Sequence, residues 1–349
     1  MSALSGCKVI QEPLPADLGA QYQGLSIPML EFDTDAYSGD IKCDFETPRV
    51  HFTLETDFSV ANSYLLLHVA EATYWDSERA TRQFHTWGFD HVEVYDIPET
   101  GVRAYVMDND DMVLVSYRGT KVVEDNQSNA AFVTLPADFG PSVSSQPAKV
   151  HAGFWSTHKT SRDGILTLIE AAGGYNKPVI FTGHSRGGSL AVLQAMYFAR
   201  MGGAVFGVHT FAQPRLGDSA LNASIAQVFG DRYYRLEHAQ DVTPQMPPTP
   251  DAAEQLYIDG KIPRWMRSFI SFLDYDDSGG DAYTLNQDGA ITQIFEPAKT
   301  ENEFWVNLFS RFPAMLFSLR ELAMDFENHH KPPVYLCEMN KGYHSSRLY

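Results

Sequence analysis

The sequence predicts an α/β protein in which helices cover both faces of a mostly parallel central sheet. Segments rich in β-branched and aromatic residues alternate along the chain with segments of helical apolar spacing, and this alternation is typical of parallel sheets. The chain has 349 residues, 44% hydrophobic and 20% charged, which is the composition of a globular protein with a large core. A Gly-x-Ser-x-Gly sequence also stands where a strand-like segment meets a helix-like one.

The predicted elements follow in order along the chain. Residues 1–50 are rich in Pro, Gly and Asp, and we expect them to form an N-terminal extension packed on a main domain of residues 51–349. Apolar spacing predicts helices at residues 57–75, 154–172 and 189–200. Strand-like composition predicts strands at residues 92–95, 103–107, 112–117, 178–182, 204–211 and 232–237, and residues 286–289 predict a hairpin turn.

Two segments have a less regular pattern. Residues 121–149 are polar and rich in Ser and Pro, with a few scattered apolar side chains. Residues 259–327 contain aromatic side chains at helical spacing, which we expect to lie in the core: Trp265, Phe269, Phe272, Trp305, Phe309 and Phe317. Asp274–Gly279 begins like a calcium-binding loop, but its twelfth position is Leu285 instead of the required Glu, so we expect an acidic surface loop.

Charge and cysteine content exclude several classes of protein. The formal net charge of −18 argues against nucleic acid or an anionic membrane surface as a main partner. No apolar run approaches the roughly 20 residues that span a bilayer. The odd number of cysteines (Cys7, Cys43, Cys337) argues against a full disulfide framework, and residues 1–24 show no signal-peptide pattern. We therefore expect a thiol-reduced, cytoplasmic protein by default, with secretion of a mature form left open.

The most informative stretch is Gly183-His184-Ser185-Arg186-Gly187, between the strand at 178–182 and the helix at 189–200. Gly-x-Ser-x-Gly at such a junction is the nucleophile elbow of the α/β-hydrolase fold. The serine of an elbow occupies a tight turn with strained backbone angles, and larger residues two positions away on either side would collide with the strand and the helix. The stretch therefore predicts an α/β-hydrolase fold with Ser185 as the nucleophile.

A serine hydroxyl needs a neighbouring base, and the base needs an orienting acid. On this fold the three residues follow in the order Ser, Asp or Glu, His. Asp241 is the favoured acid because it follows the strand at 232–237, and Asp218 and Asp231 are weaker candidates. Of the twelve histidines, those that lie beyond the candidate acids are His329, His330 and His344.

The chain resembles the fungal-type (class 3) lipases, which are α/β hydrolases. The resemblance covers about residues 60 to 250 and rests on five segments in the family's order: Val115–Thr120, Val150–Phe154, Thr182–Ala191, Phe211–Gly217 and Arg235–Pro244. It implies Ser185 as nucleophile, Asp241 as acid, and an oxyanion hole made by Thr120 and the backbone N–H of Arg186. No metal or organic cofactor is implied.

The resemblance also bears on the histidines and on one departure from the family pattern. In the family a Tyr follows the catalytic His by a few positions, which favours His330 before Tyr335, with His329 and His344 as alternatives. His151 and His184 are expected to pack or to donate and accept hydrogen bonds. Arg186 replaces the usual Leu, so we expect a long cation near the mouth of the substrate pocket.

The function implied is hydrolysis of carboxylic esters of lipids through an acyl-enzyme, as in a triacylglycerol lipase or esterase acting at a lipid–water interface. Two alternatives stay open: a phospholipase A1 or other carboxylesterase, and a catalytically silent α/β-hydrolase scaffold. Residues 121–149 hold the position of the family's lid, which predicts that Phe132, Val133, Leu135 and Phe139 cover the serine in water and turn outward on lipid. The oligomeric state is left open.

Overall fold

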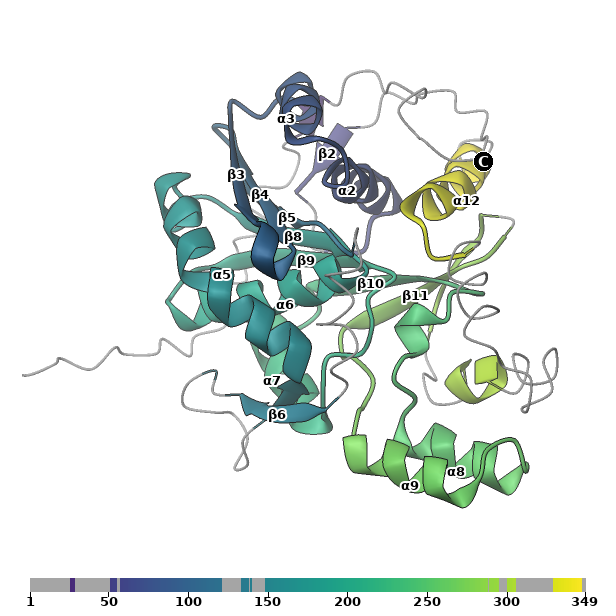
Figure 1. Cartoon of the computed structure of the whole chain (residues 1–349). Coiled ribbons are helices and arrows are strands. Elements are labelled where there is room, and N and C mark those ends of the chain that lie inside the picture. The colour runs from purple at the N-terminus through teal and green to yellow at the C-terminus, as the bar shows by residue number, and fades with distance from the viewer. Residues whose placement is uncertain are drawn as a thin grey trace, which may run out of the picture.

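The computed structural model describes residues 26–28, 51–54, 57–120, 133–137, 139, 148–287, 289–294, 300–305 and 329–346. Its described part is organised around one eight-stranded sheet with the strand order β12-β11-β10-β9-β8-β5-β4-β3 (Figure 1). The strands are β3 (His91–Ile97), β4 (Val102–Asp108), β5 (Val113–Tyr117), β8 (Val179–His184), β9 (Val205–Phe211), β10 (Tyr233–His238), β11 (Asp281–Leu285) and β12 (Ile291–Gln293).

The centre of this sheet is parallel, as predicted. Strands β5, β8, β9, β10 and β11 pair in parallel, whereas β3, β4 and β12 join the edges in antiparallel pairs. Two short antiparallel pairs lie outside it: β1 (Ser26–Pro28) with β2 (His51–Thr53), and β6 (Thr134–Ala137) with β7 (Ala148–His151). The rest of the predicted extension at residues 1–50 lies outside the described residues.

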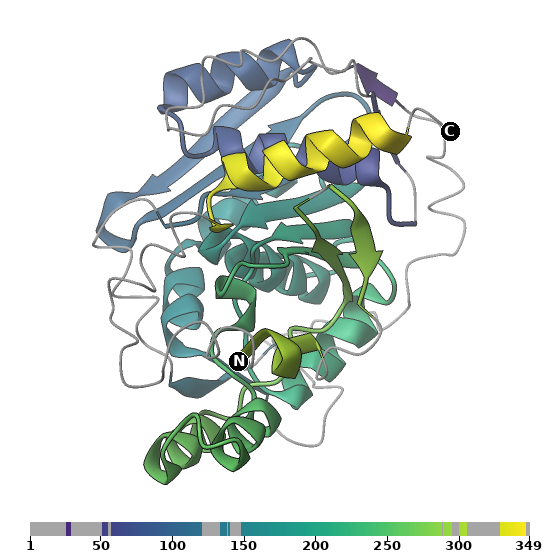
Figure 2. The ribbon, with the colours of Figure 1, turned by 90° about the vertical axis from the view of Figure 1, so that its right-hand side faces the viewer.

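Helices cover both faces of the sheet (Figures 1 and 2). One layer contains α2 (Val60–Ala72), α3 (Ser77–Thr86) and α12 (Pro332–Ser346); the other contains α5 (Ala152–Ala171), α6 (Arg186–Arg200) and α7 (Ser219–Phe229). Because successive side chains along a strand point to opposite faces, one sheet contributes side chains to both cores. Leu114 of β5 packs with the first layer, while its neighbours Val113 and Val115 pack with the second.

Two further helices, α8 (Pro250–Ile258) and α9 (Arg264–Leu273), form a hairpin that projects from the main body (Figure 1). The pair has a small core of its own, which includes Leu256, Ile270 and Trp305. Two short 3-10 helices, η2 (Pro98–Thr100) and η3 (Thr243–Gln245), and a helical segment at residues 300–305 are also described. Helices α3, α7, α8, α9 and α12 were not predicted from the sequence.

The prediction that the aromatic stripes lie in the core is correct at one position and wrong at three. Trp305 is buried at 5% exposure, but Trp265, Phe269 and Phe272 on α9 are 67%, 53% and 74% exposed. The reason is that α9 packs through its other apolar stripe, which includes Ile270 and Leu273, so the aromatic stripe faces outward. Phe309 and Phe317 lie outside the described residues.

Candidate active site

Ser185 stands on a sharp turn between β8 and α6. Its backbone angles, φ 59° and ψ −134°, lie in a region that side-chain-bearing residues rarely occupy. A Cβ on Gly183 would lie 2.4 Å from the carbonyl carbon of Gly187, and a Cβ on Gly187 would lie 2.3 Å from the carbonyl oxygen of Tyr117. The two glycines are therefore required by close packing of the turn against the helix and the neighbouring strand.

The structure brings together Ser185, His330 and Asp241 from three separate segments. His330 Nε2 lies 2.8 Å from Ser185 Oγ, and His330 Nδ1 lies 2.8 Å from Asp241 Oδ2. Ser185 follows β8, Asp241 lies in the turn after β10, and His330 lies in a turn two residues before α12. Because all three side chains are buried, their hydrogen bonds are shielded from water.

The surroundings of Asp241 keep its carboxylate charged. Burial alone would raise its pKa, but the electrostatic interaction with the His330 ring and hydrogen bonds to the carboxylate outweigh burial and lower the pKa below the usual aspartate value. The donors are His330 Nδ1, the Thr243 N–H at 2.9 Å and the Tyr335 hydroxyl at 2.7 Å. A charged carboxylate here fixes one orientation and one tautomer of the His330 ring.

Tyr335 connects α12 to this carboxylate. Its hydroxyl donates to Asp241 Oδ2 and accepts a 2.8 Å hydrogen bond from the backbone N–H of His238. From the sequence, Tyr335 indicates only the spacing that favours His330, and no contact of its hydroxyl is predicted. The contact follows from the packing of α12 against the end of β10, which spacing does not reveal.

His184 links the turn to the histidine of the site. Its Nε2 lies 2.7 Å from the backbone oxygen of His330, and its Nδ1 lies 2.9 Å from the Tyr74 hydroxyl. Burial, reinforced by nearby His330, keeps the pKa of His184 well below its usual value, so the ring is neutral, with one donor and one acceptor nitrogen. The predicted hydrogen-bonding role of His184 agrees with this geometry. Tyr74 was not identified from the sequence.

Thr120 and Arg186, the predicted oxyanion-hole residues, lie next to the serine. Thr120 follows Gly119, where an added Cβ would lie 3.1 Å from Ser185 Cβ. Arg186 is the first residue of α6, and N–H groups in a first helical turn have no acceptor within the helix. The expectation of a cation at the pocket mouth is wrong, because the Arg186 side chain is 1% exposed and donates to the Gly101 carbonyl at 2.6 Å.

The alternative residues have other surroundings. Asp218 caps α7 by accepting from the Leu221 N–H at 3.0 Å, and Asp231 is exposed. His329 stacks on His238 with ring centroids 5.6 Å apart. His151 caps α5, its Nδ1 accepting from two backbone N–H groups. The side chain of His344 lies outside the described residues.

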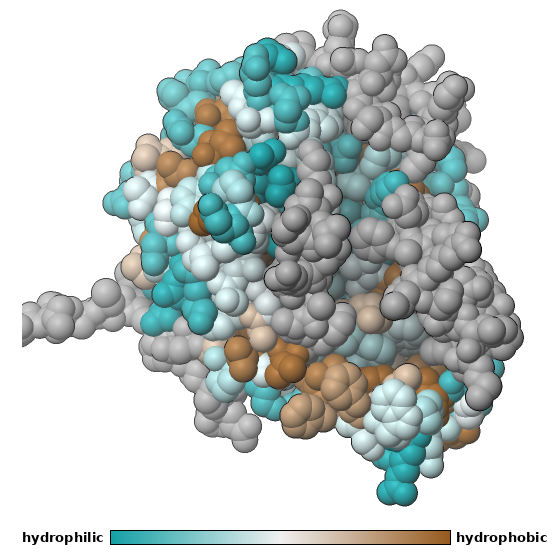
Figure 3. Space-filling model, in the orientation of Figure 1, coloured by the Kyte–Doolittle hydropathy of each residue, from teal (hydrophilic) through white to brown (hydrophobic). Residues whose placement is uncertain are grey.

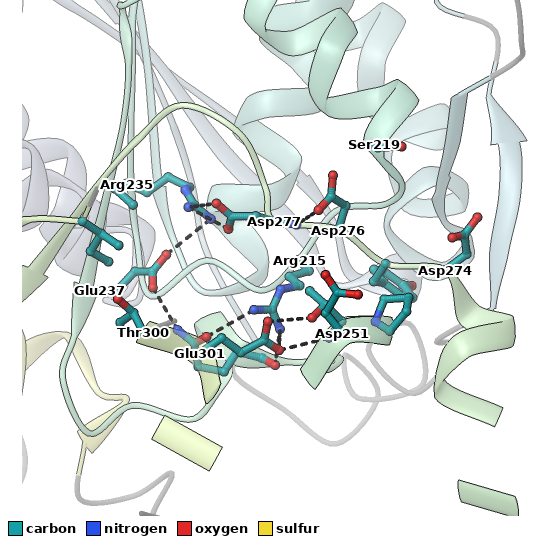
Figure 4. Close-up of a pocket in the computed structure, with 16 residues that line it drawn as sticks. Arg215, Ser219, Arg235, Glu237, Asp251, Asp274, Asp276, Asp277, Thr300 and Glu301 are labelled. Carbon is teal, nitrogen blue, oxygen red and sulfur yellow. Dashed lines mark hydrogen bonds and ion pairs between the residues drawn. The ribbon is translucent and has the colours of Figure 1, made fainter. Parts of the chain in front are cut away.

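A charged cavity of about 490 Å³ lies beside the segment that carries Asp241 (Figure 4). Its buried arginines form ion pairs: Arg215 with Glu301 at 3.2 Å, and Arg235 with Asp277 at 2.8 Å. Arg215 also donates to the Pro247 carbonyl at 2.7 Å, so this network holds the chain that follows Asp241. Across the residues that the structure describes, no grouping of His, Cys, Asp and Glu could hold a metal ion.

A mostly parallel sheet between two helical layers, with a serine on a strained turn after a central strand, defines the α/β-hydrolase fold. A structure of Rhizomucor miehei triacylglyceride lipase shares this fold with a TM-score of 0.51 at 18% identity, over 79% of this chain and 96% of that one. Residues 114–250, less than half of the chain, match the model of the family described as lipase (class 3).

Curated fungal proteins show the same relationship in sequence. Secreted mono- and diacylglycerol lipase 1 of Fusarium solani is 30% identical over 154 residues, which is 43% of this chain and 44% of that protein. Secreted mono- and diacylglycerol lipase A of Penicillium cyclopium is 28% identical over 137 residues, 39% of this chain and 43% of that one. The chain thus spans under half the length of these relatives.

The cytoplasmic, thiol-reduced state expected by default is not supported. Both relatives are named as secreted proteins, and Cys337 on α12 is disulfide-bonded, a state that persists in oxidising compartments. The chain's other cysteines, Cys7 and Cys43, lie outside the described residues. Within the described ranges, no helix combines the length and the apolar character that crossing a bilayer requires.

Proposed function

We propose that this protein is a serine hydrolase that cleaves carboxylic esters of acylglycerols through an acyl-enzyme intermediate. One observation carries the proposal: a continuous hydrogen-bonded chain runs from Ser185 Oγ through both nitrogens of His330 to the Asp241 carboxylate, with 2.8 Å at each link. In this arrangement a serine becomes nucleophilic at neutral pH, because the imidazole accepts its proton as the hydroxyl attacks.

The mechanism assigns one step to each group. Ser185 Oγ attacks the ester carbonyl carbon while its proton moves to His330 Nε2, and Asp241 stabilises the resulting imidazolium. The backbone N–H of Arg186 and Thr120 donate hydrogen bonds to the oxygen that becomes negative, each such donor contributing roughly 3 kcal/mol. His330 then gives its proton to the leaving alcohol. Water repeats the sequence on the acyl group and frees the carboxylic acid and Ser185.

The substrate class and the place of action are part of the same proposal. Acylglycerols are favoured because curated relatives are named mono- and diacylglycerol lipases. Most of the lid predicted at residues 121–149, including Phe132, lies outside the described residues. Val133 and Leu135, at the described end of that segment, are 51% and 44% exposed. An oxidising location, as in secretion, is supported by the Cys337 disulfide and the relatives' names.

The activity is tested with a fluorophosphonate probe and p-nitrophenyl esters. We expect the parent protein to be labelled and to hydrolyse these esters, and Ser185→Ala to lose labelling and at least about 10³-fold in kcat/KM. Asp241→Asn and His330→Ala should lose activity while the thermal midpoint shows that they are folded. A well-folded parent protein that neither reacts with the probe nor hydrolyses any ester would refute the proposal and favour a silent scaffold.

A further inference from the structure

The most exposed large apolar side chains among the described residues gather on the α8–α9 hairpin. Trp265, Phe269 and Phe272 of α9 are 67%, 53% and 74% exposed, and Ile258 at the end of α8 is 65% exposed. Figure 3 shows a band of hydrophobic surface along the lower edge of the molecule, where β6 and this hairpin lie. Soluble proteins rarely expose contiguous apolar surface without a binding function.

The apolar residues of α9 form a face about twice as wide as the part of it that is buried. At about 100° per residue, the apolar positions from Trp265 to Leu273 span roughly 160° of the helix. In the half away from the aromatic residues, Ile270 is buried in the core shared with α8, and Leu273 is also buried, whereas the aromatic half is exposed. Arg264, Arg267, Ser268 and Ser271 occupy the remaining polar side. A helix of this kind, with aromatic residues beside a polar face, is suited to lie in the plane of a lipid interface.

The charges of the hairpin favour one kind of lipid surface. Acidic and basic residues balance on it, three of each: Asp251, Glu254, Asp259, Lys261, Arg264 and Arg267. Glu254 and Arg267 form an ion pair with each other. The chain as a whole has a net charge of −18, so an anionic bilayer would repel it. A locally neutral, aromatic surface on an acidic protein therefore fits an uncharged or zwitterionic lipid phase.

The hairpin is also connected to the candidate active site. Val242, directly after Asp241, packs in the same small core as Leu256 and Ile270. Thr134 Oγ1 of β6 donates to the Leu273 carbonyl at the end of α9, with an oxygen–oxygen distance of 3.4 Å. The exposed apolar residues Val133 and Leu135 stand on either side of this threonine. The aromatic face thus continues toward the segment that sequence analysis assigned as a lid.

We propose that the exposed face of α9 (Trp265, Phe269, Phe272) is a docking surface for a neutral or zwitterionic lipid phase, separate from the serine site. Its role is to hold the protein at the lipid surface, while the hairpin core fixes the position of the serine site relative to that surface. The proposal extends the proposed ester hydrolysis but is tested without it, because docking requires no turnover.

The test measures co-sedimentation of the full chain carrying Ser185→Ala with phosphatidylcholine vesicles. We expect Trp265→Gln/Phe269→Gln/Phe272→Gln in this background to lower the partition coefficient at least about tenfold. The matched control, Tyr175→Gln/Met201→Gln, removes two other exposed apolar side chains (42% and 44%) outside the hairpin and should bind like the parent. Vesicles enriched in phosphatidylserine should bind the parent more weakly. Thermal unfolding verifies that each variant is folded.

Two results would overturn the proposal. Equal vesicle binding by the parent and the triple variant would show that α9 does not contact lipid. A concentration-dependent dimer in sedimentation velocity that the triple variant abolishes, without any vesicle binding by the parent, would show that the face is covered by a second copy of the chain. Neither result depends on hydrolysis, which is measured separately on the chain with an intact serine.

Discussion

Tyr335 of α12 contacts the Asp241 carboxylate of the candidate active site. Its hydroxyl satisfies two buried groups, the Asp241 carboxylate and the His238 N–H. A hydroxyl that donates to a carboxylate weakens the negative potential felt by the adjacent imidazole. Tyr335 is therefore a positioning residue that acts on the base through Asp241.

Tyr335→Phe tests this role. We expect kcat/KM to fall about tenfold and the unfolding free energy by about 1–3 kcal/mol, because two buried partners lose a hydrogen bond. Tyr64→Phe is the control, since this buried tyrosine also contacts α12, at Asn340, but not Asp241. An equal fall of kcat/KM in both variants would contradict the role of Tyr335.

Glu71 of α2 is a buried acid outside the candidate active site. Burial raises its pKa from 4.5 to about 7. A folded-state pKa above the unfolded value means that the native state holds the proton more tightly. The stability of the fold should therefore fall as the pH rises from about 4.5 to about 7, by up to about 3 kcal/mol from this group.

Glu71→Gln removes this dependence. We expect the variant to be more stable than the parent at pH values above about 7, and the difference to shrink toward pH 4.5. Urea unfolding at several pH values measures the effect. Glu78→Gln, at a carboxylate whose side chain is 84% exposed on α3, should show at most a few tenths of a kcal/mol at any pH. A pH-independent effect of Glu71→Gln would contradict the explanation.

The junction of β8 and α6 shows how local sequence and tertiary packing act together. Gly187 lies against β5, where an added methyl group would be 2.3 Å from the Tyr117 carbonyl oxygen. Gly207 of β9 is a contrasting glycine in the same sheet, with its nearest neighbour at 3.6 Å from an added Cβ. The steric requirement for glycine therefore depends on what lies opposite.

Gly187→Ala should lower the unfolding free energy by about 3 kcal/mol or more and displace Ser185, with a large loss of kcat. Gly207→Ala should lower the unfolding free energy by less than about 1 kcal/mol and leave kcat unchanged, because the added methyl group would make only ordinary van der Waals contacts. Denaturant unfolding and ester hydrolysis measure both. Similar costs at the two sites would show that the turn does not pack as described.

The alternation of elements predicted from the sequence agrees with the sheet and with helices α2, α5 and α6 to within a few residues. It did so because β5, β8 and β9 are buried on both faces and read as continuous apolar runs. The failure at α9 has an equally physical reason. Periodicity identifies an apolar stripe but not its partner, and here one of two stripes has no protein against it among the described residues.

Cys337 gives α12 a covalent link through a disulfide bond, which acts at the scale of the whole chain. It lies two residues after Tyr335 and is disulfide-bonded. A disulfide stabilises a fold mainly by restricting the unfolded chain, typically by about 2–4 kcal/mol. Dithiothreitol should therefore lower the thermal midpoint of the parent, while Cys337→Ser should start at the lower midpoint and not respond. Three reactive thiols in unreduced, denatured protein would contradict the bond.

The identity of the site was present in linear order: the elbow, a carboxylate after a late strand, and a histidine followed by Tyr335. Those signals can be read locally, because each is a short motif or the end of one predicted strand, even where its physical cause lies in another segment. Other features depend on contacts between segments far apart in sequence. They include the choice of His330, the burial of the Arg186 side chain, the contacts of Tyr74 and Tyr335, and the exposure of the aromatic face of α9. Each depends on which surfaces come into contact when the layers pack, and the spacing of residues along the chain does not show which surfaces those are.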